Sequence, residues 1–274
     1  MMIPYGQRVT PDDRTTRSRG LMRPRPTGRV LRIALAGLLA VWFALPLLPL
    51  LLWSVANRWS FPAALPAFGR SVLLGLAVAA IATPLGALAA RALTLGIVPA
   101  PRLMSALLLA PLALPAFVAV MGLTVLLLRA RVPAPLAVLL LLVAAALPYT
   151  VYTMRVAYAA HDIAFEEEAR TLGASPLAVL LRVHLPLVAP GLARAAFLAF
   201  LVGWSDYVVT VLVGEGTLVT LPLLVGSYAA GVGNEAVVAV LSLAAIIPPL
   251  LLLLALGRFG RRYPTARFSG PTPS

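Results

Sequence analysis

Six long apolar segments constrain the fold of this chain more than any other feature of its sequence. A helix needs about 20 mostly apolar residues to cross the hydrocarbon core of a bilayer. Windows of suitable length run over residues 31–54, 71–90, 103–128, 135–157, 191–213 and 236–257. The composition agrees, with 61% hydrophobic and 11% charged residues, a balance typical of membrane proteins. The sequence therefore predicts an all-α integral membrane protein with six transmembrane helices.

The arginines predict which ends of these helices face the cytoplasm. All 22 basic residues are Arg, and eighteen of them lie toward the two termini, between the second and third spans, or between the fourth and fifth spans. Only Arg58, Arg70, Arg129 and Arg131 lie in the opposite connections. Cytoplasmic connections carry the excess of Lys and Arg, so both termini are predicted to be cytoplasmic. This topology explains the net charge of +13 better than nucleic-acid binding does, because nucleic-acid modules cluster cations on a soluble face.

The rest of the composition outlines the domains and excludes some chemistry. Residues 1–29 are rich in Arg, Pro and Thr and are predicted to be a disordered basic cytoplasmic tail. Residues 30–260 are predicted to form one transmembrane domain, followed by a second cytoplasmic tail over residues 261–274. The first apolar segment is longer than the apolar region of a signal peptide, so we expect a retained span. The chain has no Cys and two His, which excludes disulfides and leaves too few ligands for a Cys- or His-based metal cluster.

Residues 158–190, between the fourth and fifth spans, form a long connection for a compact membrane bundle. Asp162 can cap a helix over about residues 163–172. Glu166–Glu168 lie in the first turns of that helix and hold three of the nine acidic residues of the chain. Carboxylates at this place complement the positive end of the helix dipole. These signals predict a short helix on the cytoplasmic side.

A second helix is predicted directly after the first. Gly173 fits a helix C-terminal position that needs positive φ, and Ser175-Pro176 fits a capped restart with Pro in the first turn. Leucines at helical spacing follow, at Leu177, Leu180, Leu181 and Leu185. They predict an amphipathic helix that ends near Pro186. Two short helices across the cytoplasmic face would form a projecting surface that can dock into a groove on a soluble partner.

The spacing within this connection resembles a known family pattern. Glu167-Glu168-Ala169, three residues, Gly173, nine residues and Val183-x-Leu185-Pro186 resemble the EAA motif of permease subunits of bacterial binding-protein-dependent ABC importers. The family pattern is Glu-Ala-Ala, three residues, Gly, nine residues and Ile-x-Leu-Pro, so the spacing agrees at every step. Two residues depart from it: Glu168 stands where the first Ala is usual, and Val183 stands for Ile.

The resemblance also covers the six spans and the position of the motif before the fifth span, which is nearly all of the chain after Arg29. It implies that the connection is the coupling helix that enters a cleft of the ATPase subunit. Glu167 would contact the ATPase, and Gly173 would set the bend between the helices. The ATPase-coupling residues that this resemblance implies are Glu167, Glu168, Ala169, Gly173, Ala174, Leu185 and Pro186. The simpler alternative is an acidic, solvated surface helix.

The same resemblance implies the partners of the chain. They are an ABC ATPase dimer, a second permease subunit that is similar or identical, a solute-binding protein outside the cell, and the lipid of a bacterial inner membrane. The chain would bind no cofactor and catalyse no reaction, since ATP would be used by the ATPase. The alternative is a secondary transporter driven by an ion gradient, which is expected to carry several ionisable groups within the membrane. A structural or signalling six-span protein is a third possibility, and it leaves the motif unexplained.

A polar segment in the fifth span is the predicted translocation path, over Trp204, Ser205, Asp206 and Tyr207. Asp206 is the only ionisable residue placed well inside a predicted span, where an isolated carboxylate is costly. It either contacts a cationic solute or the gate, or it is a structural residue. As a structural residue it would be hydrogen-bonded to a neighbouring helix or lie near the outer interface beside Trp204 and Tyr207, which favour that depth. The segment is most similar to permeases of the polyamine, thiamine, iron and phosphonate branch. His161 and His184, which flank the two short helices, are expected to be polar surface groups or groups that compensate a helix dipole.

Overall fold

The computed structural model describes residues 63–110, 116–160 and 164–262, with shorter stretches between residues 33 and 52. The chain divides into two compact units, Met1–Leu47 and Leu48–Ser274. In the first unit, residues 33–39 form a helix. Most of the predicted first span, the predicted tails except for residues 261 and 262, Asp162 and His161 lie outside the described residues. The predictions made for them therefore stay predictions.

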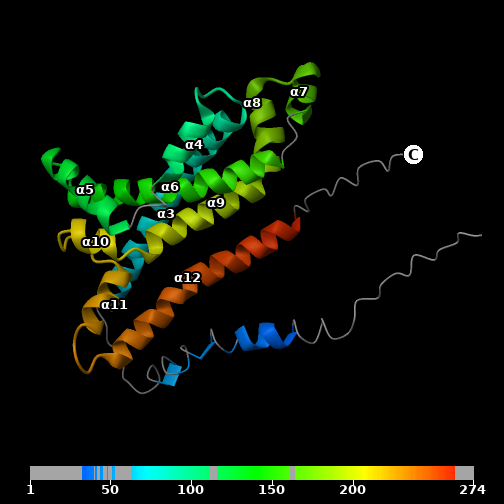
Figure 1. The fold of residues 1–274 in the computed structure, drawn as a ribbon. Coiled ribbons are helices and arrows are strands. Elements are labelled where there is room, and N and C mark those ends of the chain that lie inside the picture. The colour runs from blue at the N-terminus through cyan, green and yellow to red at the C-terminus, as the bar shows by residue number, and fades with distance from the viewer. Residues whose placement is uncertain are drawn as a thin grey trace, which may run out of the picture. The chain divides into compact units, whose positions relative to one another are not determined.

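The described part of the second unit is built of helices and contains no strand (Figure 1). Its elements are α3 (Ala64–Thr94), α4 (Pro101–Leu109), α5 (Ala116–Arg129), α6 (Ala134–Ala159), α7 (Ala164–Thr171), α8 (Pro176–Val179), the π-helical turn η2 (Leu180–His184), α9 (Leu185–Ser205), α10 (Val208–Val213), α11 (Leu221–Ala229) and α12 (Glu235–Arg262). The all-α fold predicted from the sequence is thus confirmed for these residues.

Four helices in the described residues are long and apolar enough to cross a membrane, over Ala64–Thr94, Ala134–Ala159, Pro176–Ser205 and Glu235–Arg258. They correspond to the second, fourth, fifth and sixth predicted spans. The third predicted span is not one helix, because α4 ends at Leu109 and α5 begins at Ala116. Pro111 and Pro115 lie between them, and a proline removes a backbone donor and disfavours helix at the residue before it. The predictions that the chain has six spans and that its termini are cytoplasmic stay predictions.

The fifth predicted span is also interrupted. Its long helix α9 ends at Ser205, and Asp206 has an extended backbone with φ −70° and ψ 131°. The chain then starts again as the six-residue helix α10. The window 191–213 is therefore a long helix followed by a short one, and Asp206 lies at the break rather than inside a continuous span.

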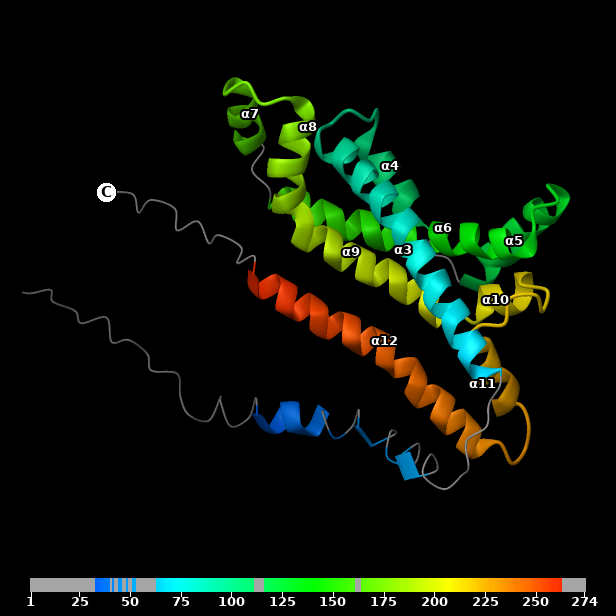
Figure 2. The same cartoon turned by 180° about the vertical axis from the view of Figure 1, so that it is seen from behind.

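The core of the second unit is a three-helix layer of α3, α6 and α9, which pack against one another (Figures 1 and 2). Small residues let the backbones approach closely, as is usual between membrane helices. Gly86 of α3 faces Thr150 of α6, and Gly203 of α9 lies against Gly75 and Val78 of α3. α3 and α6 run toward the end of the bundle where α4, α7 and α8 lie, whereas α9 starts there and runs to α10 and α11.

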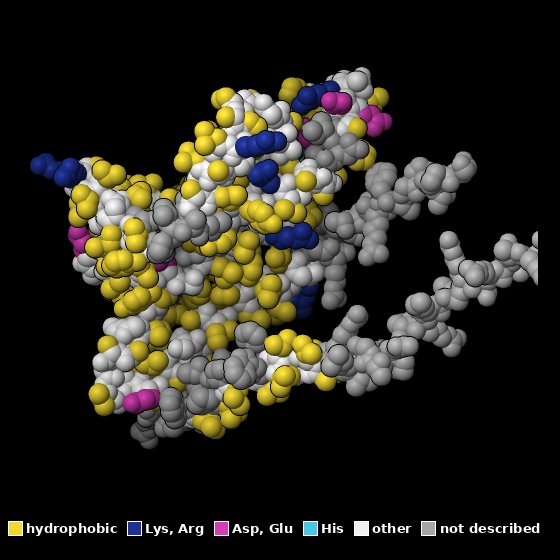
Figure 3. All heavy atoms as spheres, viewed as in Figure 1, with side chains coloured by type: hydrophobic (Ala, Val, Ile, Leu, Met, Phe, Trp, Pro, Cys, Tyr) yellow, Lys and Arg dark blue, Asp and Glu magenta, His cyan; other side chains and the backbone are white. Residues whose placement is uncertain are grey.

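The outward faces of these helices are apolar. Leu73 and Leu88 on α3 are 67% and 66% exposed, and Leu251 on α12 is 60% exposed. Figure 3 shows apolar side chains over the flanks of the helices, with acidic side chains gathered on α7. So much exposed apolar surface is unfavourable in water but is expected of helices that face lipid. The described helices therefore support a multi-pass membrane protein.

Candidate functional site

The segment from α7 to η2 forms a helical cap at one end of the α3, α6 and α9 layer (Figure 1). We call residues 164–184 the cap. α7 ends in a hydrogen-bonded turn, in which the Gly173 N–H donates to the Arg170 carbonyl and the Ala174 N–H donates to the Ala169 carbonyl. This is the Schellman pattern, which needs a left-handed residue after the helix, and Gly173 has φ +85°. The predicted glycine turn is confirmed.

The restart after the turn is also confirmed, but the predicted end of the second helix is wrong. Ser175 caps α8 by accepting a hydrogen bond from the Ala178 N–H at 3.3 Å, and Pro176 occupies the first turn. The helix does not end near Pro186. It widens into the π-helical turn η2, where the Leu185 N–H donates to the Leu180 carbonyl, and continues as α9. Pro186 has no N–H to donate to the backbone hydrogen bonds of an α-helix, and such a gap would otherwise interrupt the helix. The π-helical turn before it widens the hydrogen-bond pattern, so the helix continues.

The three consecutive glutamates of α7 differ in environment. The Glu166 side chain points into the protein and is only 5% exposed. Glu167 and Glu168, one and two positions later, are exposed. Successive residues of a helix are about 100° apart around its axis, so one face of α7 can bury a carboxylate while the other presents two. The acidic run therefore contains an internal residue and two surface residues.

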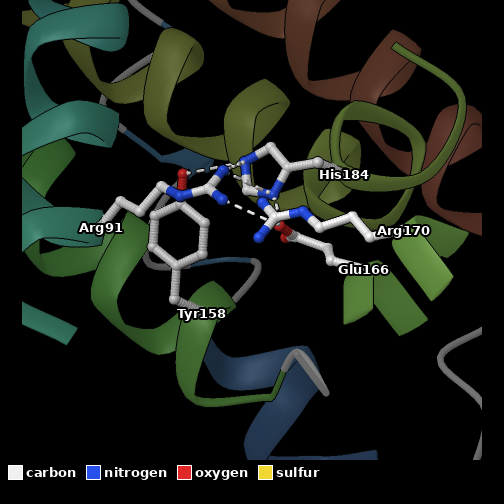
Figure 4. A network of polar contacts seen from close by, with 5 residues as sticks. All are labelled: Arg91, Tyr158, Glu166, Arg170 and His184. Carbon is white, nitrogen blue, oxygen red and sulfur yellow. Dashed lines mark hydrogen bonds and ion pairs between the residues drawn. The ribbon is translucent and has the colours of Figure 1, made fainter. Parts of the chain in front are cut away.

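Glu166 lies in a cluster of polar side chains from four elements (Figure 4). Its Oε2 atom accepts a hydrogen bond from Arg91 Nη2, on the last turn of α3, at 2.8 Å. Its Oε1 atom lies 2.7 Å from Nδ1 of His184, in η2. Arg170, one turn later on α7, approaches Oε2 at 3.9 Å from a more exposed position. We call Arg91, Glu166 and His184 the joint, because they tie the cap to α3.

His184 is buried in this cluster. Nδ1 lies 2.7 Å from Oε1 of Glu166, and Arg91 Nη1 lies 3.0 Å from Nδ1 and 2.9 Å from Nε2. The Tyr158 ring, from the end of α6, stacks on the imidazole with centroids 5.7 Å apart. The expectation that His184 is a surface group is wrong, because the residue is only 4% exposed; compensation of a helix dipole stays a prediction.

Sequence reasoning did not find the joint. Glu166 and His184 lie 75 and 93 positions from Arg91 in the sequence. From the sequence, Arg91 was interpreted as one of the arginines that set the membrane topology. A buried carboxylate between an arginine and a histidine is paired on both oxygens, so it is suited to holding elements together. Among the described residues there is also no group of three His, Cys, Asp or Glu that could hold a metal ion.

The outer face of the cap carries the residues that the sequence predicts for ATPase coupling. Glu167, Glu168 and Gly173 are exposed, and Ala169 and Ala174 are half-buried. Exposed apolar side chains lie beside them, with Phe165 at 45%, Leu172 at 82% and Leu177 at 63%. Leu185 and Pro186 are exposed at the start of α9. The cap therefore presents a mixed acidic and apolar surface, which is a composition suited to a protein partner.

The predicted translocation residues lie at the other end of α9, about 30 Å away at 1.5 Å per residue. Trp204, Ser205 and Tyr207 line an open, mostly apolar groove of about 730 Å³ between α9, α11 and α12. Trp204 is buried and donates from Nε1 to the Ala245 carbonyl at 3.0 Å. The Asp206 carboxylate caps α10: Oδ1 accepts from the Val209 N–H, and Oδ2 accepts from the N–H and the hydroxyl of Thr210.

Apolar spanning helices with a two-helix cap at one end define the class of the protein, a polytopic membrane protein with a candidate docking element. Comparison with protein families identifies it further. Residues 82–263 match the family described as "Binding-protein-dependent transport system inner membrane component". The match covers most of the chain and contains both the cap and the joint, and the chain belongs to this family. The resemblance drawn from the EAA spacing is thereby confirmed at the level of the family.

Three curated proteins are similar to parts of the chain. The alpha-glucoside transport system permease protein AglG of Rhizobium meliloti is 31% identical over 41% of this chain and 30% of its own length. The diacetylchitobiose uptake system permease protein DasC of Streptomyces coelicolor is 36% identical over 41% of each. The trehalose transport system permease protein SugB of Mycobacterium tuberculosis is 27% identical over 46% of each. The matched region thus spans less than half the length of these relatives.

Proposed function

We propose that the chain is the membrane-spanning permease subunit of an ATP-driven importer, and that its cap is the element by which an ATPase dimer drives it. The observation that carries this proposal is the exposed pair Glu167 and Glu168, set before a Gly173 turn at one end of a helical membrane bundle. The family match over residues 82–263 supports it. A second permease subunit would complete the pore, and an external solute-binding protein would deliver the solute. ATP hydrolysis would take place in the ATPase, and the chain itself would bind no cofactor.

A secondary transporter is a weaker proposal for this chain. Ion coupling calls for ionisable groups along a path through the membrane. Asp206, the one candidate from the sequence, accepts hydrogen bonds through both carboxylate oxygens from backbone N–H groups in the first turn of α10. Glu166 and Arg91 pair with each other at the cap end. These groups have structural partners that account for their charge, and the family model is one of binding-protein-dependent transport.

The substrate that we propose is a small sugar, and a polyamine is not supported. The three relatives are named for alpha-glucoside, diacetylchitobiose and trehalose transport. A polyamine path would call for carboxylates that can meet its cationic groups, whereas the Asp206 carboxylate is engaged with backbone and hydroxyl donors. The open groove beside Trp204 and Tyr207 combines aromatic and apolar walls with the Ser205 hydroxyl. Such a lining suits a neutral solute better than a polycation.

The coupling role is tested by co-purification of the chain with the products of its neighbouring genes. The double variant Glu167→Ala with Gly173→Pro should lose the ATPase and lose ATP-dependent uptake, because it removes a surface carboxylate and the φ +85° turn. The matched control is Glu235→Ala with Gly233→Pro, an acidic residue and a φ +81° glycine near the start of α12. The control should keep the ATPase. If the chain with Glu167→Ala and Gly173→Pro still assembles with the ATPase and still takes up solute, the proposal is contradicted.

The substrate class is tested in vesicles that contain the assembled importer. Labelled disaccharides of the three kinds named above and labelled putrescine should be compared, each with and without ATP. ATP-dependent accumulation of a sugar, unaffected by ionophores that collapse ion gradients, is the expected result. Uptake that needs an ion gradient and no ATP would support the secondary transporter instead.

A further inference from the structure

The joint is a polar link between the cap and the membrane helices. α7 packs on α8 and η2, which belong to the same connection. Its charged link to α3 is the pair of Arg91 and Glu166, in which Nη2 and Oε2 are 2.8 Å apart. The exposed side of the cap faces outward, and Glu166 faces inward. A force applied to Glu167 or Glu168 therefore reaches α3 through the adjacent residue.

The Glu166 carboxylate and the His184 imidazole of the joint are shielded from water. The Glu166 and His184 side chains are 5% and 6% exposed, and Arg91 is 29% exposed. A buried charge that loses its partner is strongly unfavourable, because neither water nor another group replaces the lost interaction. Glu166 therefore favours one placement of α7 on α3, and other placements leave the carboxylate without the guanidinium.

His184 is the third residue of the joint. Its imidazole lies against both Oε1 of Glu166, at 2.7 Å, and Nη1 of Arg91, at 2.9–3.0 Å, so it links the carboxylate to the guanidinium a second time. It lies in η2, which leads directly into α9. A displacement of α7 is thereby transferred to the start of α9 as well as to the end of α3. Both helices belong to the three-helix layer.

We propose that Arg91, Glu166 and His184 are positioning residues that make the cap and the ends of α3 and α9 move as one body, and that Glu166 transmits force without belonging to the partner-docking surface. This inference rests on the proposed function of the cap. It divides the acidic run by role: Glu167 and Glu168 meet the partner, whereas Glu166 connects the cap to the membrane helices. Loss of the joint should leave docking intact and weaken coupling.

The first test measures the placement of the cap in the full chain alone. The chain has no Cys, so Leu172→Cys on the cap and Leu88→Cys on α3, which are 82% and 66% exposed, give two specific spin-label sites. In lipid nanodiscs, the distribution of label distances should broaden at least about twofold in Glu166→Gln, Arg91→Met and His184→Phe, since each leaves a buried polar partner unmatched. The double variant Arg91→Met with Glu166→Gln should resemble the singles, because residues of one network are not additive.

Matched controls accompany each change. Glu168→Gln repeats the Glu166→Gln chemistry at an exposed site two residues away, and Arg182→Met repeats the Arg91→Met chemistry on the exposed side of η2. Both should keep the narrow distribution of the parent. If Glu166→Gln and Glu168→Gln give the same distribution as the parent, the joint does not hold the cap and the inference is overturned.

The second test separates docking from coupling in the assembled importer. Joint variants should retain the co-purified ATPase, while the solute taken up per ATP hydrolysed falls about tenfold, within the usual range of coupling between sites. If the joint variants lose the ATPase as the Glu167→Ala with Gly173→Pro variant does, Glu166 belongs to the docking surface and the inference is overturned. Failure of the parent chain to bind an ATPase would overturn the proposed function instead, and the spin-label measurement would still decide whether the joint positions the cap.

Discussion

The close contact between Gly86 and Thr150 gives a quantitative prediction about the packing of α3 against α6 next to the joint. Gly86 lies on α3 five residues before Arg91, and Thr150 lies on α6 eight residues before Tyr158. Thr150 is fully buried. A Cβ atom at position 86 would lie 2.5 Å from the Thr150 Cβ atom and would clash with its hydroxyl oxygen. Gly86→Ala therefore cannot be accommodated without a movement of α3 or α6.

The size of the effect follows from this distance. Ordinary carbon contacts begin near 3.4 Å, so the two Cβ atoms must separate by about 0.9 Å. Overpacking of a tight core costs about 1–3 kcal/mol, and alanine recovers about 1 kcal/mol of helix propensity relative to glycine. Gly69→Ala, on the same helix with no atom within 4 Å of the new Cβ, receives only the gain. Because both variants receive this gain, they should differ in stability by the overpacking cost alone, about 1–3 kcal/mol, which corresponds to about 2–12 °C in Tm.

The assay is the fraction of monodisperse protein that survives heating in detergent, measured by size-exclusion chromatography. Gly86→Ala should aggregate at a lower temperature than Gly69→Ala. Thr150→Gly in the Gly86→Ala background should recover part of the loss, because the nearest remaining atom of Thr150 would be its carbonyl carbon at 3.1 Å. Equal midpoints for Gly86→Ala and Gly69→Ala would refute the close approach of α3 and α6.

Two further predictions concern the opposite end of the bundle. Ser71→Ala should lower stability by about 1–3 kcal/mol in the same assay, because the Ser71 hydroxyl accepts the buried Leu221 N–H at 2.7 Å; a midpoint within 1 °C of the parent would count against this bond. Asp206→Asn should leave sugar uptake close to that of the parent, since Asn caps a helix about as well as Asp, whereas Asp206→Ala should cost about 1 kcal/mol of stability. Loss of uptake in Asp206→Asn, with stability unchanged, would show that the negative charge itself serves transport.

Local rules predicted the cap well, because its signals are short in sequence. Gly173 is the residue that accepts positive φ most readily, and Ser175-Pro176 satisfies the first turn of a helix from its own side chains and backbone. Neither signal depends on the rest of the fold. The end of the second helix was predicted wrongly, because Pro186 is a stop signal only for a regular α-helical ladder. The π-helical turn over Leu180–His184 lets the helix continue.

The sequence by itself determined that the chain is a helical membrane protein, and the spacing from Glu167 to Pro186 indicated its family. Both follow from composition and from the spacing of residues that are close together in the sequence, and neither depends on how the rest of the chain folds. Only the tertiary structure decided the environment of Glu166, which looks identical to Glu167 and Glu168 in the sequence. Its pairing with Arg91 and His184 depends on α3 and η2 meeting at the same end of the bundle. Contacts between residues 75 or 93 positions apart arise from helix packing, and no local pattern encodes them.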